Sequence, residues 1–466
     1  MKDKDTELFE NSPVLNAILR LAVPTVIGQI ILVIYNMADT YFIGLTGSDA
    51  MLTAVTVCMP AFMFISAISN LFGIGGAATI SQALGKKDTG KAANASAFAL
   101  YGCLLTMLAY AVCAFAFRHS FIDALGGSNP EVHVHAIKYL MVTVVFGGLF
   151  TAVGTLLSHL IRSEGRSIEA STGIAVGGIL NVLLDPLFMF VILPKGNEAL
   201  GAAIATALSN VIVCLYFVFL IIRLQKTGTC LTFRFNDKAL TDKSAFDIIL
   251  IGLPACLMTL FENISYALLD HLMAQAGMAY QAGVGVAKKV NMLAHCIVRG
   301  MSQGVLPLIA YNYAAGNYKR MKHSILISSA MSVSCSILTM AICLLFTRQL
   351  IGIFINNEGA SLYYGMRFLQ ILCIGCPFSA FAYAVISFFQ AIGESRRSFF
   401  LATLRKGALD IPLMIILNRH LPAYGIVMAT PITDVICCIV AVISFIRILR
   451  HIKSEMVRGE TEIIHA

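Results

Sequence analysis

The sequence predicts an all-α integral membrane protein in which twelve transmembrane helices form two six-helix lobes related by an internal repeat. Hydrophobic residues make up 58% of the 466 residues and charged residues only 12%, about half the charged fraction of soluble domains. Apolar runs long enough to cross a hydrocarbon core of ~30 Å recur along the whole length. Segments of the first half also reappear in the second half, about 230 residues later.

Each apolar run is interpreted as one membrane-spanning helix. Several runs exceed the ~20 residues that a span needs, so we expect tilted or kinked helices. In chain order, the twelve runs are 15–45, 52–80, 94–117, 137–161, 169–193, 200–222, 247–272, 281–312, 324–346, 365–391, 398–418 and 424–448.

Three pairs of segments carry the repeat. They are Leu21–Pro24 with Ile251–Pro254, Ile80–Lys87 with Tyr311–Tyr318, and Gly201–Thr206 with Gly425–Thr430. The repeat predicts an N-terminal lobe over 1–222, a cytoplasmic linker over 223–246 and a C-terminal lobe over 247–466. Two such lobes facing each other across a cleft are typical of secondary transporters.

The positive residues predict the orientation in the membrane. With the N-terminus inside, the inner segments carry 24 Lys and Arg residues and the outer segments carry 6. This split follows the positive-inside rule, with both termini in the cytoplasm and an even number of spans. The net charge of +8 therefore reflects the membrane and not a nucleic-acid partner. Residues 1–10 are polar, unlike a signal peptide, so the first span is expected to remain in the mature protein.

Motifs of the common catalytic and nucleotide-binding sites are missing from the sequence. It contains no GxxxxGK[ST], HExxH or GxSxG pattern, which disfavours an ATP-driven pump and an enzyme, and favours transport driven by an ion gradient without a cofactor. Cys373-x-x-Cys376 lies in an apolar run without a second pair at zinc spacing, so we interpret it as packing.

Buried polar residues predict an ion site in the first half. At 1.5 Å per residue, Asp39 lies ~10 Å, Asp185 ~13 Å and Thr206 ~8 Å below the outer boundary, and Asn181 shares a helix face with Asp185. Ionisable groups at such depth are costly and need a reason. The four side chains are expected to chelate a hard monovalent cation, or the two carboxylates to share a proton. The alternative is that each aspartate pairs with a helix neighbour.

The motif Asn181-x-x-x-Asp185-Pro186-Leu187-Phe188 resembles the multidrug and toxic compound extrusion (MATE) family of transporters. Further resemblances are Pro24, Tyr35, Asp39-Thr40 and Gly44; Gly85-Lys86-Lys87-Asp88; Tyr311-Asn312-Tyr313 with Gly316-Asn317; and Pro254 with Phe261-Glu262. The segment Phe9–Pro13 is similar to the bacterial MepA-like and DinF-like branches. The resemblance covers nearly the whole chain.

The resemblance implies a monomeric antiporter in the bacterial inner membrane, in contact with membrane lipid. It would export amphipathic, often cationic, small molecules by alternating access, coupled to H⁺ or Na⁺. Asp39, Asn181, Asp185 and Thr206 would then bind the cation, and Pro24 would let the first helix bend. One departure is that the run 365–391 lacks the carboxylate that some members carry there, which disfavours coupling through the second lobe.

The run 281–312 carries a polar stripe with two interpretations. Lys288, Asn291, His295, Arg299 and Ser302 fall within about 80° of one helix face. The stripe either faces a structural partner, Glu262, or serves function, as the contact for a substrate with a negative or zwitterionic portion or as a proton path through His295. The substrate cavity is assigned to Tyr35, Asn36, Glu262, Tyr266, His295 and Arg299. The stripe also keeps open a lipid-linked oligosaccharide flippase as the alternative function; an intramembrane enzyme is the more distant one.

Overall fold

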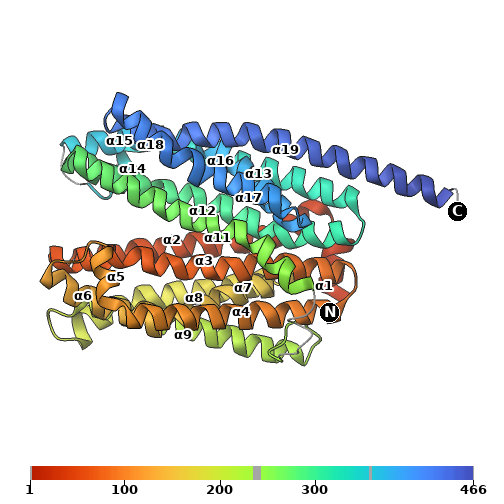
Figure 1. Cartoon of the computed structure of the whole chain (residues 1–466), viewed down its shortest axis with the longest axis horizontal. Helices are drawn as coiled ribbons and strands as arrows, with labels where there is room; N and C mark the ends of the chain where they lie inside the picture. Colours follow the sequence, from red (N-terminus) through yellow and green to blue (C-terminus); the bar gives the residue numbers. More distant parts are fainter. Residues whose placement is uncertain (1–2, 235–242, 356–358, 465–466) are drawn as a thin grey trace. The chain divides into compact units, whose positions relative to one another are not determined.

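The computed structural model describes residues 3–234, 243–355 and 359–464, and every regular element in these ranges is a helix. Figure 1 follows the helices along the chain. Their bounds are α1 Asp3–Glu10, α2 Val14–Gly44, α3 Asp49–Gly85, α4 Thr89–Ala116, α5 Arg118–Ala124, α6 Pro130–Leu140, η1 Met141–Phe146, α7 Gly148–Ser163, α8 Ser167–Pro186, η2 Leu187–Ile192, α9 Glu198–Gln225, α11 Lys243–Ala276, α12 Met278–Ala314, α13 Tyr318–Leu345, α14 Thr347–Gly352, α15 Ala360–Ile374, α16 Cys376–Ile392, α17 Ser395–Thr403, η3 Leu404–Asp410, α18 Ile411–His420 and α19 Tyr424–Ile464.

These helices account for all twelve predicted spans. Within the described residues, nine helices are long and apolar enough to cross a membrane, and two bent helix pairs each supply one more span. The twelfth is the continuous stretch α17–η3–α18 at 395–420. Its middle holds Arg405, Lys406 and Asp410, all buried, so it carries more charge than an ordinary span. The predicted fold class is confirmed.

The internal repeat extends to irregular features of the helices. One bent span, α6–η1 with α7, breaks by 45° next to Gly147, and the other, α15 with α16, breaks by 43° next to Gly375. Short helices also recur in matching places, α5 after α4 and α14 after α13. Both halves therefore share their breaks as well as their spans.

The loops correct one detail of the repeat. Lys87 (φ 59°) and Gly316 (φ 74°) both adopt the left-handed conformation two residues after a helix end, and Asp88 and Asn317 follow them as N-caps. Lys87 thus corresponds to Gly316, and the pairing of Ile80–Lys87 with Tyr311–Tyr318 was shifted by two residues. The shared glycine had suggested that register, although the left-handed position is what the loops have in common.

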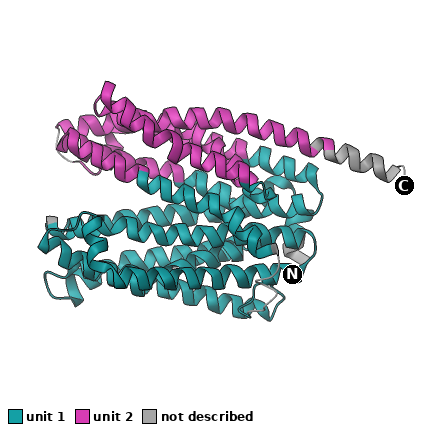
Figure 2. Ribbon diagram, viewed as in Figure 1, with its two compact units in different colours: residues 1–264, 296–328, 390–395 teal, residues 265–295, 329–389, 396–466 magenta. Residues whose placement is uncertain are grey.

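Two compact units emerge from the packing, shown in different colours in Figure 2. One comprises residues 1–264, 296–328 and 390–395, and the other 265–295, 329–389 and 396–466. The lobe boundaries at 222 and 247 follow the sequence repeat and stay a prediction. The central part of the predicted linker, 235–242, lies outside the described residues.

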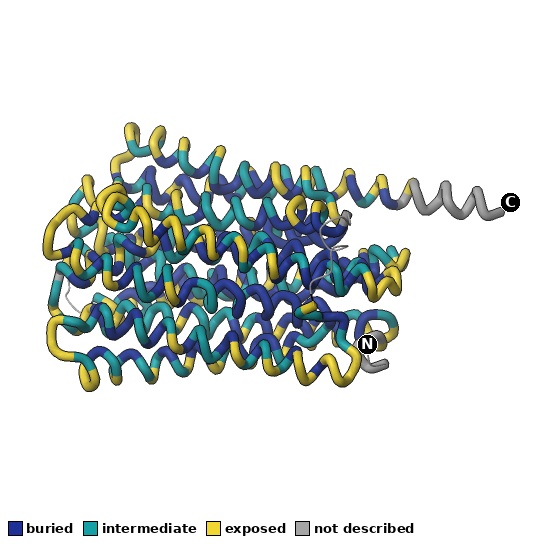
Figure 3. Tube along the Cα trace, turned by 60° about the horizontal axis from the view of Figure 1, so that its bottom comes forward, coloured by how far each residue is buried: buried dark blue, intermediate teal, exposed yellow. Residues whose placement is uncertain are grey.

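Glycines set the close packing of helices around α8. A Cβ at Gly177 would meet the Val213 side chain of α9, and one at Gly178 would come 2.7 Å from Ile31 of α2. Small residues let helix backbones approach closely inside a membrane. As Figure 3 shows, buried and exposed residues alternate along many of the helices, so these helices have one face packed in the protein and one face outside it, whereas α7 has no exposed residue.

Candidate functional site

The four side chains predicted to bind a cation come from three packed helices. We call Asp39 of α2, Asn181 and Asp185 of α8, and Thr206 of α9 the first-lobe cluster. The Asn181 Nδ2 atom donates to the Thr206 Oγ1 atom at 3.1 Å and to the Asp185 Oδ1 atom at 3.4 Å. The amide of Asn181 therefore joins the acid on its own helix to the hydroxyl of the next.

Three oxygens of the first-lobe cluster are buried without a hydrogen-bond donor among the described residues. They are the Oδ1 atom of Asp39, the Oδ1 atom of Asn181 and the Oδ2 atom of Asp185. Asp185 is fully buried, Asn181 is 2% exposed and Thr206 7% exposed, whereas Asp39 is half-buried. A buried carboxylate or amide oxygen without a donor has the capacity to accept a proton or to coordinate a cation.

Electrostatic interactions place Asp39 with this cluster. The charges of Asp39 and Asp185 act on each other, and both act on the phenols of Tyr35 and Tyr139. Carboxylates whose charges repel each other in a buried setting favour uptake of a cation or of a proton. Tyr139 was missed by the sequence analysis, because a single tyrosine in an apolar run gives no signal of its own.

The helix that carries Asp185 changes its geometry directly after this residue. Asp185 is followed by Pro186, which has no backbone N–H, and α8 changes there into the π-helical segment η2. Such π segments are frequent at functional sites. Tyr35 packs on the same face, because a Cβ at Gly178 would lie 3.2 Å from its ring.

The chemistry of the cluster is that of hard oxygen ligands. It offers carboxylate, amide and hydroxyl oxygens, which suit a hard cation or a proton. Within residues 3–234, 243–355 and 359–464, no group of three or more His, Cys, Asp or Glu side chains is placed to hold a metal ion.

The residues assigned to a substrate cavity have mostly structural partners. Glu262 of α11 forms an ion pair with Arg299 of α12. Asn36 donates to the Leu32 carbonyl oxygen at 2.6 Å. The ring of Tyr266 lies 4.9 Å from the ammonium of Lys288, and His295 is 9% exposed.

The other stripe residues also have partners. The Lys288 ammonium lies 2.7 Å from the Asp270 carboxylate. The Asn291 Oδ1 atom accepts from the Cys376 thiol at 3.2 Å, and both Cys373 and Cys376 are free, buried thiols. The structural interpretation of the stripe is thus supported at Arg299, Lys288 and Asn291.

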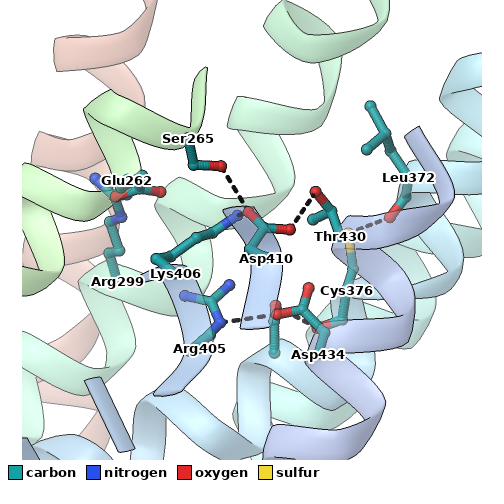
Figure 4. Close-up of polar contacts among 11 residues, drawn as sticks. Glu262, Ser265, Arg299, Leu372, Cys376, Arg405, Lys406, Asp410, Thr430 and Asp434 are labelled. Carbon is teal, nitrogen blue, oxygen red and sulfur yellow. Dashed lines mark hydrogen bonds and ion pairs between the residues drawn. The ribbon is translucent and has the colours of Figure 1, made fainter. Parts of the chain in front are cut away.

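A second buried polar cluster lies in the second half, where the sequence suggested that Asp410 and Asp434 could pair with Arg405 or Lys406. Figure 4 shows Ser265 of α11, Lys406 and Asp410 of η3, and Thr430 of α19, which we call the second-lobe cluster. Beside it, Arg405 pairs with Asp434 at 2.8 Å. Lys406, Asp410 and Thr430 stand where the second half echoes Asn181, Asp185 and Thr206.

The family is decided by a match in both halves. The MatE family model matches residues 24–187 and 254–416, once in each half and starting each time at a proline. This chain belongs to the MATE family.

Curated relatives of this MATE protein match over almost their full length. The multidrug export protein MepA of Staphylococcus saprophyticus is 30% identical over 95% of this chain and 96% of its own. MepA of Staphylococcus aureus is 28% identical, with the same coverage.

Solved structures show the same fold. An outward-facing multidrug resistance MATE family transporter of the MOP superfamily has a TM-score of 0.89 at 23% identity, covering 97% of this chain and 100% of its own. A MATE crystal structure in complex with MaL6 has a TM-score of 0.88 at 24% identity, with the same coverage. The multi-pass membrane fold is therefore established for this MATE protein.

Proposed function

We propose that this MATE protein is a multidrug exporter: a cation-coupled antiporter that moves amphipathic, often cationic, organic molecules out of the cell by alternating access. The observation that carries the proposal is the first-lobe cluster, with a buried acid, a half-buried acid and oxygens that lack a donor. Occupation of this cluster by Na⁺ or H⁺ would favour one arrangement of α2, α8 and α9. A substrate that favours another arrangement would then be exchanged for the ion.

The relatives support the substrate class. Proteins named multidrug export protein match this chain from end to end. Their bacterial origin supports a location in the bacterial inner membrane, with small molecules as substrates and lipid as the surroundings. Within this proposal the protein acts as a monomer with both termini in the cytoplasm, and Tyr35, Asn36, Glu262, Tyr266, His295 and Arg299 line the substrate path.

The flippase alternative is less well supported. A flippase for lipid-linked oligosaccharides would present basic side chains to a pyrophosphate. Arg299, Lys288, Arg405 and Lys406 instead each pair with a carboxylate, which reduces the positive charge that they offer to an anion.

The test uses purified protein in lipid vesicles with an imposed Na⁺ gradient or an imposed pH gradient. A gradient that drives movement of a fluorescent lipophilic cation identifies the coupling ion, and neither gradient doing so would refute the antiport. Asp39→Asn keeps the size of the side chain but removes its charge. We expect this variant to express and fold like the wild type and to lose gradient-driven transport, and wild-type rates in the variant would contradict a role of Asp39 in coupling.

A further inference from the structure

The two halves carry the same polar positions on corresponding helices. Asn181-x-x-x-Asp185 is followed by Pro186 on α8, and Lys406-x-x-x-Asp410 is followed by Pro412 at the start of α18. Thr206 and Thr430 each stand five residues after a glycine, Gly201 and Gly425, near the start of the next span. One difference stands out, because the asparagine of the first half is a lysine in the second.

The second-lobe cluster surrounds its acid completely. The Asp410 Oδ2 atom accepts from the Lys406 Nζ atom at 2.9 Å and from the Ser265 Oγ atom at 2.6 Å. The Asp410 Oδ1 atom accepts from the Thr430 Oγ1 atom at 3.1 Å. Asp410 is fully buried and Lys406 is 3% exposed, so the pair lies away from solvent. Figure 4 shows the contacts among these side chains.

The first-lobe cluster uses the same positions and leaves its acid incomplete. Asn181 donates to Asp185 and Thr206, as Lys406 donates to Asp410, but an amide brings no charge. The Asp185 Oδ2 atom has no donor among the described residues, whereas both oxygens of Asp410 have one. The two halves therefore hold a carboxylate at the same position, but only Asp410 has a cationic side chain, Lys406, bonded to it. Asp185 has only the neutral amide of Asn181.

We infer that the second-lobe cluster is the counterpart of the first-lobe cation site, and that the Lys406 ammonium is its built-in cation. The inference rests on the proposed function for the identity of the first-lobe site. An ammonium held by its own helix supplies the positive charge that a buried carboxylate requires, and the ring of Tyr266, 5.6 Å away, adds a cation–π contact. The neighbouring Arg405–Asp434 pair is balanced as well. The second lobe thus needs no ion from solution, and a free cation acts on the first lobe alone.

The test replaces the ammonium by the residue of the first lobe. Lys406→Asn is made in full-length protein that also carries Asp39→Asn and Asp185→Asn, so that the first-lobe cluster contributes no charge. Lys406→Met in the same background is the matched control, since it removes the charge without adding an oxygen ligand. The unfolding temperature in detergent is measured at pH 8 in sodium chloride and in choline chloride at equal ionic strength, and bound ²²Na⁺ is counted.

We expect the unfolding temperature of Lys406→Asn to be several degrees higher in sodium chloride than in choline chloride, because a ligand that binds only the folded state stabilises it. We also expect this variant to retain ²²Na⁺. Lys406→Met and the parent protein should show neither response. A folded Lys406→Asn protein that is indifferent to sodium would overturn the inference, as would equal responses in all three proteins. If Lys406→Asn does not fold in choline, recovery of folded protein in sodium supports the inference, and failure to recover it opposes it.

This experiment separates the inference from the proposed function. The background already lacks the acids of the first-lobe cluster, so the sodium response of Lys406→Asn reports on the second lobe alone. If vesicles with wild-type protein respond to neither gradient, the antiport proposal fails, whereas the sodium response of Lys406→Asn is still read independently.

Discussion

Glu262 and Arg299 show what a charged residue requires in a transmembrane helix. The Glu262 side chain is 10% exposed and that of Arg299 is 37% exposed, so the pair lies at the edge of the protein interior. An acid at this position needs a counter-charge, since a bare carboxylate in such surroundings is far more costly than a paired one. Arg299 supplies that charge from the adjacent α12.

Removal of one partner should therefore cost more than removal of both. We expect Arg299→Ala to lower the free energy of unfolding by about 1–3 kcal/mol, less than for a fully buried pair because Arg299 is partly exposed. The double variant Arg299→Met with Glu262→Gln should recover most of that loss and much of the transport. The measurement is the unfolding temperature together with uptake of cationic and zwitterionic compounds.

A different outcome would identify Arg299 as a substrate-binding residue. In that case Arg299→Ala would remain as stable as the wild type, and transport of anionic or zwitterionic compounds would fall while lipophilic cations still moved. An Arg299→Ala protein with unchanged stability and unchanged substrate profile would contradict both interpretations.

Single residues differ in how far the sequence could predict them. Asn181 and Asp185 could be placed together because helix periodicity fixes which side chains share a face. The bonding of Asn181 to Thr206 and the position of Tyr139 beside the acids depend on how three helices pack, which no local pattern encodes. Lys406 was visible in the sequence, but its pairing with Asp410 gained meaning only through the geometry of the repeated cluster.

At the scale of the element, the close approach of α3 and α11 is set by two glycines. A Cβ at Gly252 would collide with the backbone oxygen of Leu71, and one at Gly75 with that of Ile248. Side chains can rotate out of a clash, whereas a backbone oxygen inside a helix cannot. The two helices therefore depend on glycine at both positions for this packing distance.

This dependence predicts a large effect from a single methyl group. Gly252→Ala should lower the free energy of unfolding by about 1–3 kcal/mol, as other overpacking substitutions do. Gly44→Ala is the matched control, because a Cβ at this helical glycine meets nothing within 4 Å. The measurement is the unfolding temperature of the two variants in the same detergent, and equal values would refute the packing argument.

The existence and approximate position of the spanning helices could be predicted from the apolar runs, but their exact bounds, the short helices between them and the sites of the breaks could not. The sequence gives Gly147 and Gly375 no special context among the 36 glycines, yet a span bends beside each of them. The same holds for the π-helical segments η1, η2 and η3. Such distortions are selected by neighbouring helices that satisfy the freed backbone groups, and this information is not local.

At the scale of the whole molecule, the repeat combines one scaffold with two different uses. Matching breaks at Gly147 and Gly375 and matching loops at Lys87 and Gly316 indicate that both halves fold alike. Their polar clusters diverge at Asn181 and Lys406. If the first-lobe cluster binds the coupling ion as proposed, one half responds to an ion and the other does not, so that a single ion-binding event can change the balance between two arrangements.

The arrangement in the membrane gives the last prediction, since the charge bias predicts which ends of the helices face the cytoplasm. An impermeant maleimide applied to intact cells should label cysteines placed at Lys195 and Arg419 and spare those placed at Lys86, Lys238 and Lys319, until the cells are opened. The thirteen native cysteines can also react with the maleimide, and among the described residues Cys113 is the exposed one. The wild type is therefore labelled in parallel to measure this background. Lys195 lies between η2 and α9, and Arg419 lies in the last turn of α18. Each position is at the end of a span that is predicted to run from the inner to the outer side, and each half contributes one of them. Labelling of Lys238→Cys in intact cells would place the segment between the halves outside. It would then require an odd number of spans before α11, and the six-plus-six arrangement would have to be abandoned.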